Sequence, residues 1–513
     1  MKFILATTLW LITFLSFSQN INISNANFFE GEPYLSIDPS NNQHLVSAWM
    51  GFQLGEAVVI KTSFSNDGGI SWSNPIYLQH TIAGNTSADP SLAYDNSGNL
   101  FVCYIDYDEN NFTNGAIFIR KSVDGGISWG TEVEAISITD CPNKLCVDRP
   151  WMVIDQSDNI YITSMNANQP TIVSPYYNPY VVVSSDLGTS FSTPIFIDGP
   201  NYLAGDVIKQ PMPSPTISDD GTFYAAYPSY ETNQSLWAHI YIAKSIDQAS
   251  NFTYSSAYNG GSGSLDIYAK KGALLISNPT NSTHLAYFIP LDINGDIDIF
   301  MIETTDGINW SAPERINQDG IGNAKMQDLV WADFNENGDL AVCWRDRRNA
   351  SSSGYQTETE IYGSIRFSGN AAFDQDFAIS SQQVNHAAVL ENAGNDFMNV
   401  NFIGDTIYAV WGDVRTGTLN IFLNKFNVND ASSSITTIYQ ESNLITIYPN
   451  PTNDYFIIKD YDKLTNVRLL TMKGELIQVI KNEKVTIDKL NSGQYLVAYD
   501  VNNKSFTSKI IVD

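Results

Sequence analysis

The sequence predicts an all-β protein, with a β-propeller followed by a small Ig-like β-sandwich. Two observations predict the propeller, for which seven blades are favoured over six. A strand that ends in a small residue and an aromatic one recurs seven times, starting at residues 44, 99, 159, 222, 283, 339 and 406. Each copy has further short strands around it, and four short strands in a unit of about 40–60 residues are typical of a propeller blade.

The charge balance excludes two classes of partner. The chain has 513 residues, with 27 Lys and Arg against 55 Asp and Glu, and a formal net charge of −28. Nucleic acids and anionic membrane surfaces attract basic faces, so neither is an expected partner. Hydrophobic residues make up 43% of the chain, which is ample for a folded core, and four cysteines are too few for a disulfide scaffold.

Residues 1–18 are typical of a cleaved secretory signal peptide. Lys2 gives the positive start, an apolar stretch follows, and small residues at its end predict cleavage before Gln19. An uncleaved membrane anchor is the alternative interpretation of residues 1–18, but the apolar stretch is too short to favour it. No other run reaches the ~18 apolar residues of a spanning helix. We therefore expect a mature chain without a membrane-spanning segment.

The predicted propeller covers residues 19–430. In each copy a first strand precedes the recurring second strand, and a third strand, a tight turn and a fourth strand follow. The last copy lacks a clear fourth strand, and Ile21 to Phe29 can supply it and close the ring.

The turns between third and fourth strands carry a repeated motif, S-x-D-x-G-x-x-W. Three copies match it well and three are degenerate, and the last of these, Ser368–Phe373, lacks the Asp. The acidic residues of the other five are Asp67, Asp124, Asp186, Asp247 and Asp306. In this motif the Asp accepts backbone N–H bonds within the hairpin, the Gly adopts a left-handed conformation and the aromatic residue packs between sheets. These aspartates are expected to be structural, because their turns lie at the end of the blade opposite the loops that follow the second strand.

These motifs are Asp boxes, or BNR repeats, and residues from about 30 to 430 resemble the sialidase-like Asp-box propeller superfamily. The resemblance implies a protein that acts on or binds extracellular glycans. The superfamily includes exo-α-sialidases and other glycan-active enzymes, and also non-catalytic propellers with glycan or protein ligands, so both classes stay open. A polysaccharide lyase is a weaker third alternative.

Two sets of loops carry matching polar residues at the expected functional face. After the second strand, the pattern W-x-D-x-R appears at Trp344–Arg348 and again at Trp411–Arg415. Before the first strand, five of the seven blades carry a carboxylate, namely Glu32, Asp89, Asp148, Asp328 and Asp396.

The resemblance to sialidases implies roles for some of these side chains. A sialidase clamps the carboxylate of its substrate with three arginines and uses an Asp as general acid. The candidates for substrate binding are Arg149, Arg345, Arg348 and Arg415, and the candidate acids are Asp106 and Asp148. The family's F-R-I-P motif, which supplies the first clamp arginine, is absent. Inter-blade ion pairs and turn caps are the alternative role for the same aspartates and arginines.

Cofactor signals are weak. The sequence contains no P-loop or GxGxxG motif, and its five His have no zinc spacing, so no metal ligand is assigned. The segments Asp292–Asp298 and Asp333–Asp339 are rich in Asp, Asn and Gly, which leaves a bound Ca²⁺ open, although turns use the same residues.

The cysteines have two expected roles. Cys141 and Cys146 are predicted to close a small disulfide loop, which export permits and which would brace the start of the third blade. Cys103 and Cys343 lie in second strands and are expected to be buried free thiols.

The C-terminal region forms a separate predicted unit. Residues 431–443 are expected to be a linker, and residues 444–513 a β-rich domain with YPNP, MKGE and LNSGQYLV segments. These segments resemble the C-terminal sorting domain of the bacterial type IX secretion system. The resemblance implies a Bacteroidota-type protein that the secretion machinery exports, to be released or held at the cell surface.

Overall fold

The computed structural model describes residues 20–167, 169, 171–174, 177–198, 211–229, 239–259, 273–385, 395–428, 446–459, 461–471, 476–487, 490–501 and 504–512. The predicted signal peptide and the predicted linker lie outside these residues. The chain divides into two compact units, one ending at Val428 and one starting at Asn429.

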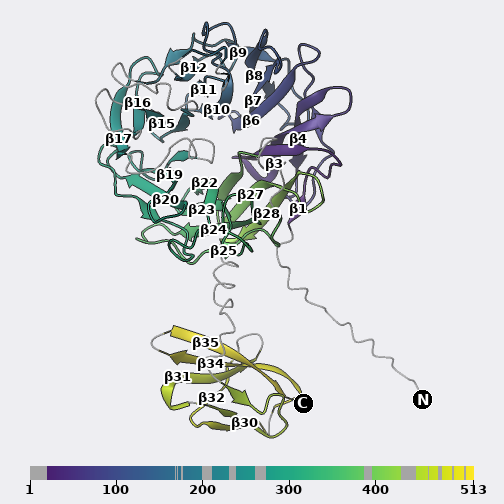
Figure 1. Cartoon of the computed structure of the whole chain (residues 1–513), viewed down its shortest axis with the longest axis vertical. Helices are drawn as coiled ribbons and strands as arrows, with labels where there is room; N and C mark the ends of the chain where they lie inside the picture. Colours follow the sequence, from purple (N-terminus) through teal and green to yellow (C-terminus); the bar gives the residue numbers. More distant parts are fainter. Residues whose placement is uncertain are drawn as a thin grey trace, which may run out of the picture. The chain divides into compact units, whose positions relative to one another are not determined.

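The first unit is a β-propeller. Its described residues form seven four-stranded antiparallel sheets that follow one another around a ring in chain order, and we number these blades 1 to 7 (Figure 1). First strands of neighbouring blades pack against one another, which places them at the centre of the ring. The sheets confirm the prediction of seven blades.

The strands are named by their place in the blade, from blade 1 to blade 7. The first strands are β2 (Glu30–Asp38), β6 (Thr86–Tyr94), β10 (Asp148–Ile154), β14 (Ser214–Ile217), β18 (Leu274–Ser277), β22 (Gln327–Phe334) and β26 (Asn399–Ile403). The second strands are β3 (Asn41–Gln53), β7 (Leu100–Tyr107), β11 (Ile160–Met165), β15 (Phe223–Ser229), β19 (Leu285–Leu291), β23 (Leu340–Asp346) and β27 (Thr406–Asp413).

The outer half of each blade is built in the same order. The third strands are β4 (Ala57–Ser65), β8 (Gly115–Ser122), β12 (Pro179–Ser184), β16 (His239–Ser245), β20 (Asp298–Thr304), β24 (Glu360–Arg366) and β28 (Asn420–Asn427). The fourth strands are β5 (Ile76–Tyr77), β9 (Val133–Ser137), β13 (Ile195–Phe196), β17 (Thr253–Asn259), β21 (Glu314–Arg315), β25 (Phe377–Ala378) and, in blade 7, β1 (Ile21–Asn22).

The N-terminal strand closes the ring, as the sequence predicts. β1 pairs with β28, and Ile21 lies opposite Leu423. Blade 7 therefore contains strands from both ends of the propeller, joined by backbone hydrogen bonds.

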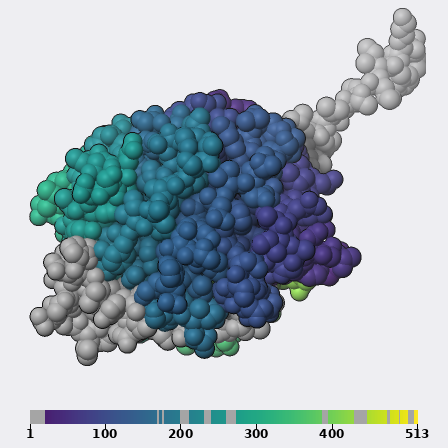
Figure 2. All heavy atoms as spheres, turned by 90° about the horizontal axis from the view of Figure 1, so that it is seen from above, coloured from purple at the N-terminus to yellow at the C-terminus, as the bar shows by residue number. Residues whose placement is uncertain are grey.

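The second strands are buried on both faces because each blade is packed between two others. In β7, Leu100 and Val102 pack in a cluster with blade 1, whereas Phe101 and Cys103 pack in a cluster with blade 3. Alternate side chains of a strand point to opposite faces, so one apolar run serves both interfaces. Figure 2 shows neighbouring blades in contact along one side of the ring. Cys103 and Cys343 are buried and free.

The Asp-box turns share one hydrogen-bond pattern. In blade 1, the backbone N–H of Ser71 donates to Asp67 Oδ1 at 2.9 Å, and the Ser65 hydroxyl donates to the same atom at 2.8 Å. The equivalent backbone bonds to Asp124, Asp186 and Asp247 are each 2.9 Å, and the bond to Asp306 is 2.7 Å. These side chains are engaged in their own turns, at the end of the blade away from the loops that follow the second strand.

One box shows that the backbone of the turn is kept even where glycine is lost. Gly188 has φ +77°, and Ala249, at the same position in blade 4, has φ +59°. A left-handed conformation is costly for a residue with a Cβ. The serine and aspartate hydrogen bonds of the turn compensate for it in blade 4.

The second unit is a small β-sandwich. One sheet contains β29 (Ile447–Tyr448), β30 (Tyr455–Ile458) and β33 (Lys484–Thr486), and the other contains β32 (Leu476–Val479), β31 (Thr465–Thr471), β34 (Gly493–Val501) and β35 (Lys504–Val512). The single-turn 3₁₀ helix η1 (Tyr461–Lys463) connects the two. Phe456, Leu469 and Val497 belong to one apolar core shared by both sheets. Within the described residues, no helix has the length and apolar character needed to cross a bilayer.

Candidate functional site at the centre of the propeller

The same backbone irregularity occurs at the start of four first strands. In β2, β6, β10 and β22, two residues face a single residue of the second strand, which is the pattern of a β-bulge. The first residue of each bulge has a positive φ, at Glu32 (+54°), Asp89 (+54°), Arg149 (+51°) and Leu329 (+57°). Such angles are unusual for residues other than glycine, and bulges next to functional sites redirect side chains.

Proline explains part of the local geometry. Glu32, Asp89 and Arg149 are each followed by a proline. Proline cannot donate to the ladder and is tolerated in a sheet at bulges and edges. The repeated X-Pro pair is therefore the sequence signal of the bulge in blades 1 to 3.

The three bulges bring side chains of adjacent blades together at the centre of the ring. We call this site the central mouth, and it consists of Glu32, Asp89, Asp148, Arg149 and Asp396. Arg149 Nη2 donates to Asp396 Oδ2 at 2.7 Å, and its guanidinium lies 5.0 Å from the centre of the Phe397 ring. Asp396 precedes the first strand of blade 7, so four blades contribute to the mouth.

The electrostatics of the central mouth centre on Glu32. This residue is 4% exposed, and its carboxyl group lies within hydrogen-bonding contact of that of Asp89. Burial raises the pKa of Glu32 well above its usual value, and the charges of Asp89 and Asp396 raise it further, whereas Arg149 acts in the opposite direction. Burial and these neighbouring charges therefore favour the protonated form of the Glu32 carboxyl group.

The guanidinium of Arg149 is stabilised in its charged form. Burial acts to lower the pKa of Arg149, but Asp396, Asp89, Asp148 and Glu32 together raise it. Tyr107, at the end of β7, faces the same carboxyl groups: burial, followed by the charges of Asp89 and Asp148, raises its pKa. Tyr107 was not among the candidates from the sequence, since no motif marks it.

The structure pairs three of the four predicted clamp arginines with nearby aspartates. Arg345 donates two hydrogen bonds to Asp328, at 2.8 and 2.6 Å. Arg415 is paired with Asp413 two residues before it, through bonds of 3.0 and 2.7 Å.

The remaining candidate of these three, Arg348, also forms its ion pairs within one blade. Arg348 Nη2 donates to both Asp346 and Asp376, each at 2.7 Å. Of the four candidates, Arg149 alone is placed in the central mouth. The other three form ion pairs within blades 6 and 7, where the sequence suggested pairs between blades.

The two candidate acids differ in their surroundings. Asp148 begins β10, next to Arg149, and acts on its pKa. Asp106 is 2% exposed, and its oxygens accept hydrogen bonds from Asn85 at 2.7 Å and Ser87 at 2.8 Å and contact His80 Nδ1 at 2.5 Å. Asp106 therefore holds the loop before β6 in place, and Asp148 is the candidate acid that lies in the central mouth.

The predicted disulfide is present beside the mouth. Cys141 and Cys146 are bonded, and the second of them is two residues from Asp148. The loop closed by this bond leads directly into β10 and the bulge at Arg149. The disulfide therefore restrains the segment that leads to Arg149.

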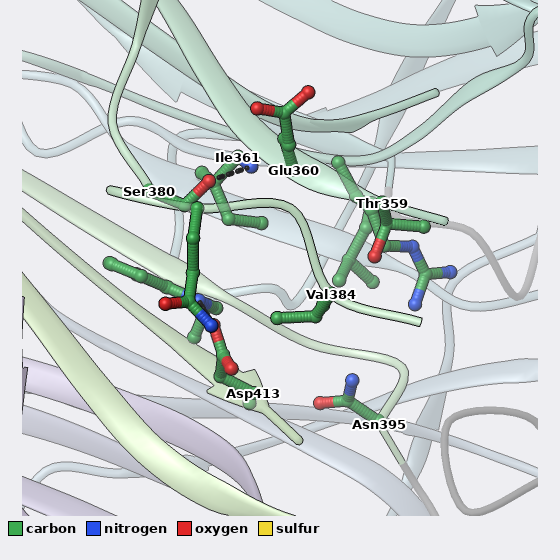
Figure 3. A pocket seen from close by; sticks show the side chains of 12 residues that line it. Thr359, Glu360, Ile361, Ser380, Val384, Asn395 and Asp413 are labelled. Carbon is green, nitrogen blue, oxygen red and sulfur yellow. Dashed lines mark hydrogen bonds between the residues drawn. The ribbon is translucent and has the colours of Figure 1, made fainter. Parts of the chain in front are cut away.

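A small cavity lies between blades 6 and 7 (Figure 3). Its lining includes Arg345, Glu360, Ser380, Asn395 and Asp413. Arg345 Nη1 and Asn395 Oδ1 are buried there without a partner. The cavity volume is about 10 Å³, which is the space of about one water molecule.

Metal coordination has no arranged site in the described part of the chain. There, no three His, Cys, Asp or Glu side chains are placed so that they can hold one ion. In the segment Asp292–Asp298, Asp298 is paired with Arg315 at 2.8 Å, so a guanidinium takes the position of a cation.

Comparison with known families identifies the C-terminal unit. Residues 446–513 match the family described as the secretion system C-terminal sorting domain. The chain therefore carries the export signal that its sequence predicts, which directs it through type IX secretion to the cell surface or the medium. No curated protein matches the chain.

Several solved structures are similar to the propeller at low scores. A protein of unknown function from Dyadobacter fermentans has 13% identity and a TM-score of 0.44, and the match covers 68% of this chain and 97% of that one. A Hadza microbial sialidase has 14% identity and a TM-score of 0.42, with 77% and 75% covered. An α-L-arabinofuranosidase of Fusarium graminearum has 12% identity and a TM-score of 0.45, with 81% and 99% covered. At these scores the similarities carry no conclusion about activity, and the fold rests on the chain's own sheets.

Proposed function

We propose that this protein is an exported glycoside hydrolase that takes an extracellular glycan in the central mouth. The observation that carries the proposal is Glu32, a buried carboxyl group in a β-bulge, whose pKa both Asp89 and Arg149 affect. Perturbed carboxyl groups that four blades bring together are typical of acid–base chemistry.

The chemistry follows from the two kinds of carboxyl group in the mouth. A glycosidase needs one acid that is protonated at working pH to donate to the leaving oxygen, and burial supplies that property to Glu32. The transition state carries positive charge on the sugar, which Asp148 and Asp396 are placed to stabilise. Arg149 fixes Asp396 through their ion pair.

A sialidase-type substrate is not favoured by this geometry. Three converging guanidinium groups bind the carboxylate of a sialoside, whereas Arg345, Arg348 and Arg415 are each paired with an aspartate of blade 6 or 7. Arg149 itself is paired with Asp396. The proposed substrate is therefore a glycan without a carboxylate at the cleaved sugar.

A second function, a non-catalytic propeller that binds a glycan or a surface protein, is favoured by one observation. The Glu32 and Asp89 carboxyl groups are in hydrogen-bonding contact. An acid and a nucleophile in a retaining glycosidase are about 5–5.5 Å apart, so Asp89 cannot be the second catalytic carboxylate. Asp148 or Asp396 must fill that role if the protein is an enzyme.

Hydrolysis by the full mature chain tests the proposal. The substrates are fluorogenic glycosides of neutral sugars, an amino sugar and sialic acid, and the variants are Glu32→Gln and Glu134→Gln. Glu134 is an exposed carboxyl group on β9 and serves as the matched control. We expect turnover of a non-anionic glycoside, and a loss of about 10²–10⁴-fold in kcat for Glu32→Gln alone.

The other outcomes separate the two functions. Binding on a glycan array that Glu32→Gln weakens, without turnover, supports the non-catalytic function at the same mouth. Turnover of the sialoside that survives Glu32→Gln contradicts the proposal, as does a chain that neither binds nor cleaves any glycan.

A further inference from the structure

His80, in the loop between β5 and β6, contacts two neighbouring blades. Its side chain is 1% exposed, and its Nδ1 atom lies 2.5 Å from Asp106 Oδ2 near the end of β7 in blade 2. Its Nε2 atom lies 3.0 Å from the carbonyl oxygen of Glu56, in the turn between β3 and β4 of blade 1. The ring therefore connects a turn of blade 1 to the second strand of blade 2.

The two contacts together require a doubly protonated ring. A carboxylate and a backbone carbonyl are both acceptors, and a neutral imidazole has one N–H group, whereas an imidazolium donates from both nitrogens. The electrostatics agree with this geometry. Burial acts to lower the pKa of His80, but the hydrogen bond and charge of Asp106, followed by the contact with Glu56, raise it overall.

Asp106 is the fixed end of this connection. Its Oδ1 atom accepts from Asn85 Nδ2 at 2.7 Å, and its Oδ2 atom accepts from the Ser87 hydroxyl at 2.8 Å. Both donors lie in the segment that leads to the bulge at Asp89 in the central mouth. These two bonds do not depend on the proton of His80, so the contact with the Glu56 carbonyl is the end that can open.

The turn between β3 and β4 lies at the same end of blade 1 as the central mouth. Gly31, which precedes Glu32, is paired with Met50, and β3 ends three residues later at Gln53. Leu54 follows in the turn and is 81% exposed. A contact that fixes this turn therefore fixes a loop next to the strand end that carries Glu32.

We propose that His80 is a pH-operated latch on the turn between β3 and β4. The protonated ring holds the turn to β7 through its two N–H groups. As pH rises, Nε2 loses its proton to the solvent, and Nδ1 keeps its proton because the Asp106 carboxylate stabilises it. The Nε2 lone pair then faces the Glu56 carbonyl oxygen without a proton between them, and the turn is released. This inference does not rest on the proposed function.

The direction of the switch follows from the groups around His80. Besides Asp106, the charged and titratable groups that face the pair are Glu56, Tyr104, Arg120 and Glu132. Arg120 is paired with Glu132 at 2.5 Å, so these two charges offset each other. Because the pKa of His80 is raised in the folded protein, the latch is closed below the unfolded value of about 6.5. It opens as pH rises through the folded value.

Spin labelling of the full mature chain tests the latch. A nitroxide attached at Leu54→Cys reports the mobility of the turn by electron paramagnetic resonance between about pH 5.5 and 9. The native free cysteines Cys103 and Cys343 are buried and do not compete for the label. The control label is attached at Val123→Cys, which is 77% exposed on the Asp-box turn of blade 2.

We expect the label at position 54 to gain mobility as pH rises. The gain follows a one-proton titration, with about one tenth of the change one pH unit below the midpoint and about nine tenths one unit above it. Asp106→Asn removes the carboxylate that stabilises the charged ring, so it shifts the midpoint to lower pH. His80→Gln abolishes the titration, because an amide does not ionise in this range. The label at position 123 does not change.

Three results would overturn the inference. The first is a label at position 54 whose mobility is independent of pH, a result that needs no further variant. The second is a transition that survives His80→Gln or whose midpoint Asp106→Asn leaves in place, since another group would then be responsible. The third is a parallel change at position 123, which would show that the whole propeller loosens and that no local latch exists.

Discussion

A tryptophan Nε1–H that donates to a buried carboxylate recurs in three blades. In blade 6, Trp344 donates to Asp346 at 2.7 Å, and in blade 7, Trp411 donates to Asp413 at 3.0 Å. Blade 1 has Gly51 where the others have the aspartate, and Glu30 from the neighbouring strand accepts the bond from Trp49. The space left by the missing side chain holds this carboxyl group, since a Cβ on Gly51 would overlap it.

These contacts give the W-x-D-x-R pattern a role within its blade, and its role as a substrate clamp stays a prediction. Residues two apart in a strand share a face, so the Trp and the Asp of one copy lie side by side, and the Arg follows two residues after the strand ends. Asp413 therefore accepts from both Trp411 and Arg415. The period of the strand is visible in the sequence and favours local pairing. Asp328 on β22 forms an ion pair with Arg345 on β23. This pair depends on the register between the two strands, which the sequence does not show.

Moving the carboxylate of blade 1 from position 30 to position 51 tests whether Glu30 takes the role that the aspartate has in blades 6 and 7. Glu30→Ala leaves Lys61 and the Trp49 N–H buried without their partner, and we expect it to destabilise the propeller by about 3 kcal/mol. Gly51→Asp alone is also destabilising, because it crowds Glu30. The double variant restores a W-x-D pair, so urea unfolding followed by tryptophan fluorescence should show a smaller loss than the sum of the single variants. A loss equal to that sum would contradict the shared role.

The His80–Asp106 pair gives a pH dependence with a definite sign. Burial acts to lower the pKa of His80, but the hydrogen bond and charge of Asp106 raise it overall. Protonated His80 therefore stabilises the folded state fully below its unfolded pKa of about 6.5, and this stabilisation is lost as pH rises through the folded value. Urea unfolding between about pH 6 and 8.5 measures the decline.

The Asp106→Asn variant isolates that effect from other groups. Asp333, whose pKa burial raises to about 7, titrates in both proteins and cancels in the difference. We expect the variant to lack part of the decline in unfolding free energy. A decline as steep as that of the wild type would show that His80 is not charged in the folded protein.

At the scale of elements, the repeated blades made the architecture predictable from the sequence. The candidate site was less predictable, because it depends on the bulges. The spacing of the second strands is enough to count seven blades, because each blade repeats the same buried strand. The missing fourth strand of the last copy pointed to closure by the N-terminus for the same reason. In each bulge, two residues of the first strand lie opposite one residue of the second strand. This depends on how the two strands pair, so the sequence of one strand does not predict it. The X-Pro pairs at Glu32, Asp89 and Arg149 are its visible trace.

Ring closure depends on more than the two residues of β1. Asn420 on β28 is fully buried, and its Oδ1 accepts from the Ala26 N–H at 2.7 Å and from the Ser24 hydroxyl at 3.0 Å. Its Nδ2 donates to the Ala26 carbonyl at 3.1 Å. One side chain therefore fixes the N-terminal segment to the last blade.

We expect Asn420→Ala to weaken closure. Loss of these bonds leaves buried backbone groups unpaired, which costs about 2 kcal/mol. Hydrogen exchange should rise first in β1 and β28, ahead of blades 3 and 4. The control is Asn370→Ala, an exposed turn position that should change stability by less than about 0.5 kcal/mol. Uniform exchange across all seven blades would argue against a local role for Asn420.

At the scale of the whole molecule, the two units have separate cores and separate tasks. The apolar core of the sandwich is formed by its own strands, and the propeller is closed by β1. Neither core needs the other for burial of its residues. The acidic propeller contains the candidate site, and the sorting domain contains the export signal.

Removal of residues 446–513 should therefore change where the protein goes and leave its fold unchanged. The propeller closes through β1 and β28, so the thermal unfolding of the shortened chain should match that of the propeller in the full chain. Because export through type IX secretion reads the sorting domain, fractionation of a producing cell with this system should find the shortened propeller inside the outer membrane. The full chain should be at the surface or in the medium, and both should cleave or bind the same glycan. A shortened chain that reaches the medium would show that the sorting domain is not needed, and one that melts at a lower temperature would show that the two units stabilise each other.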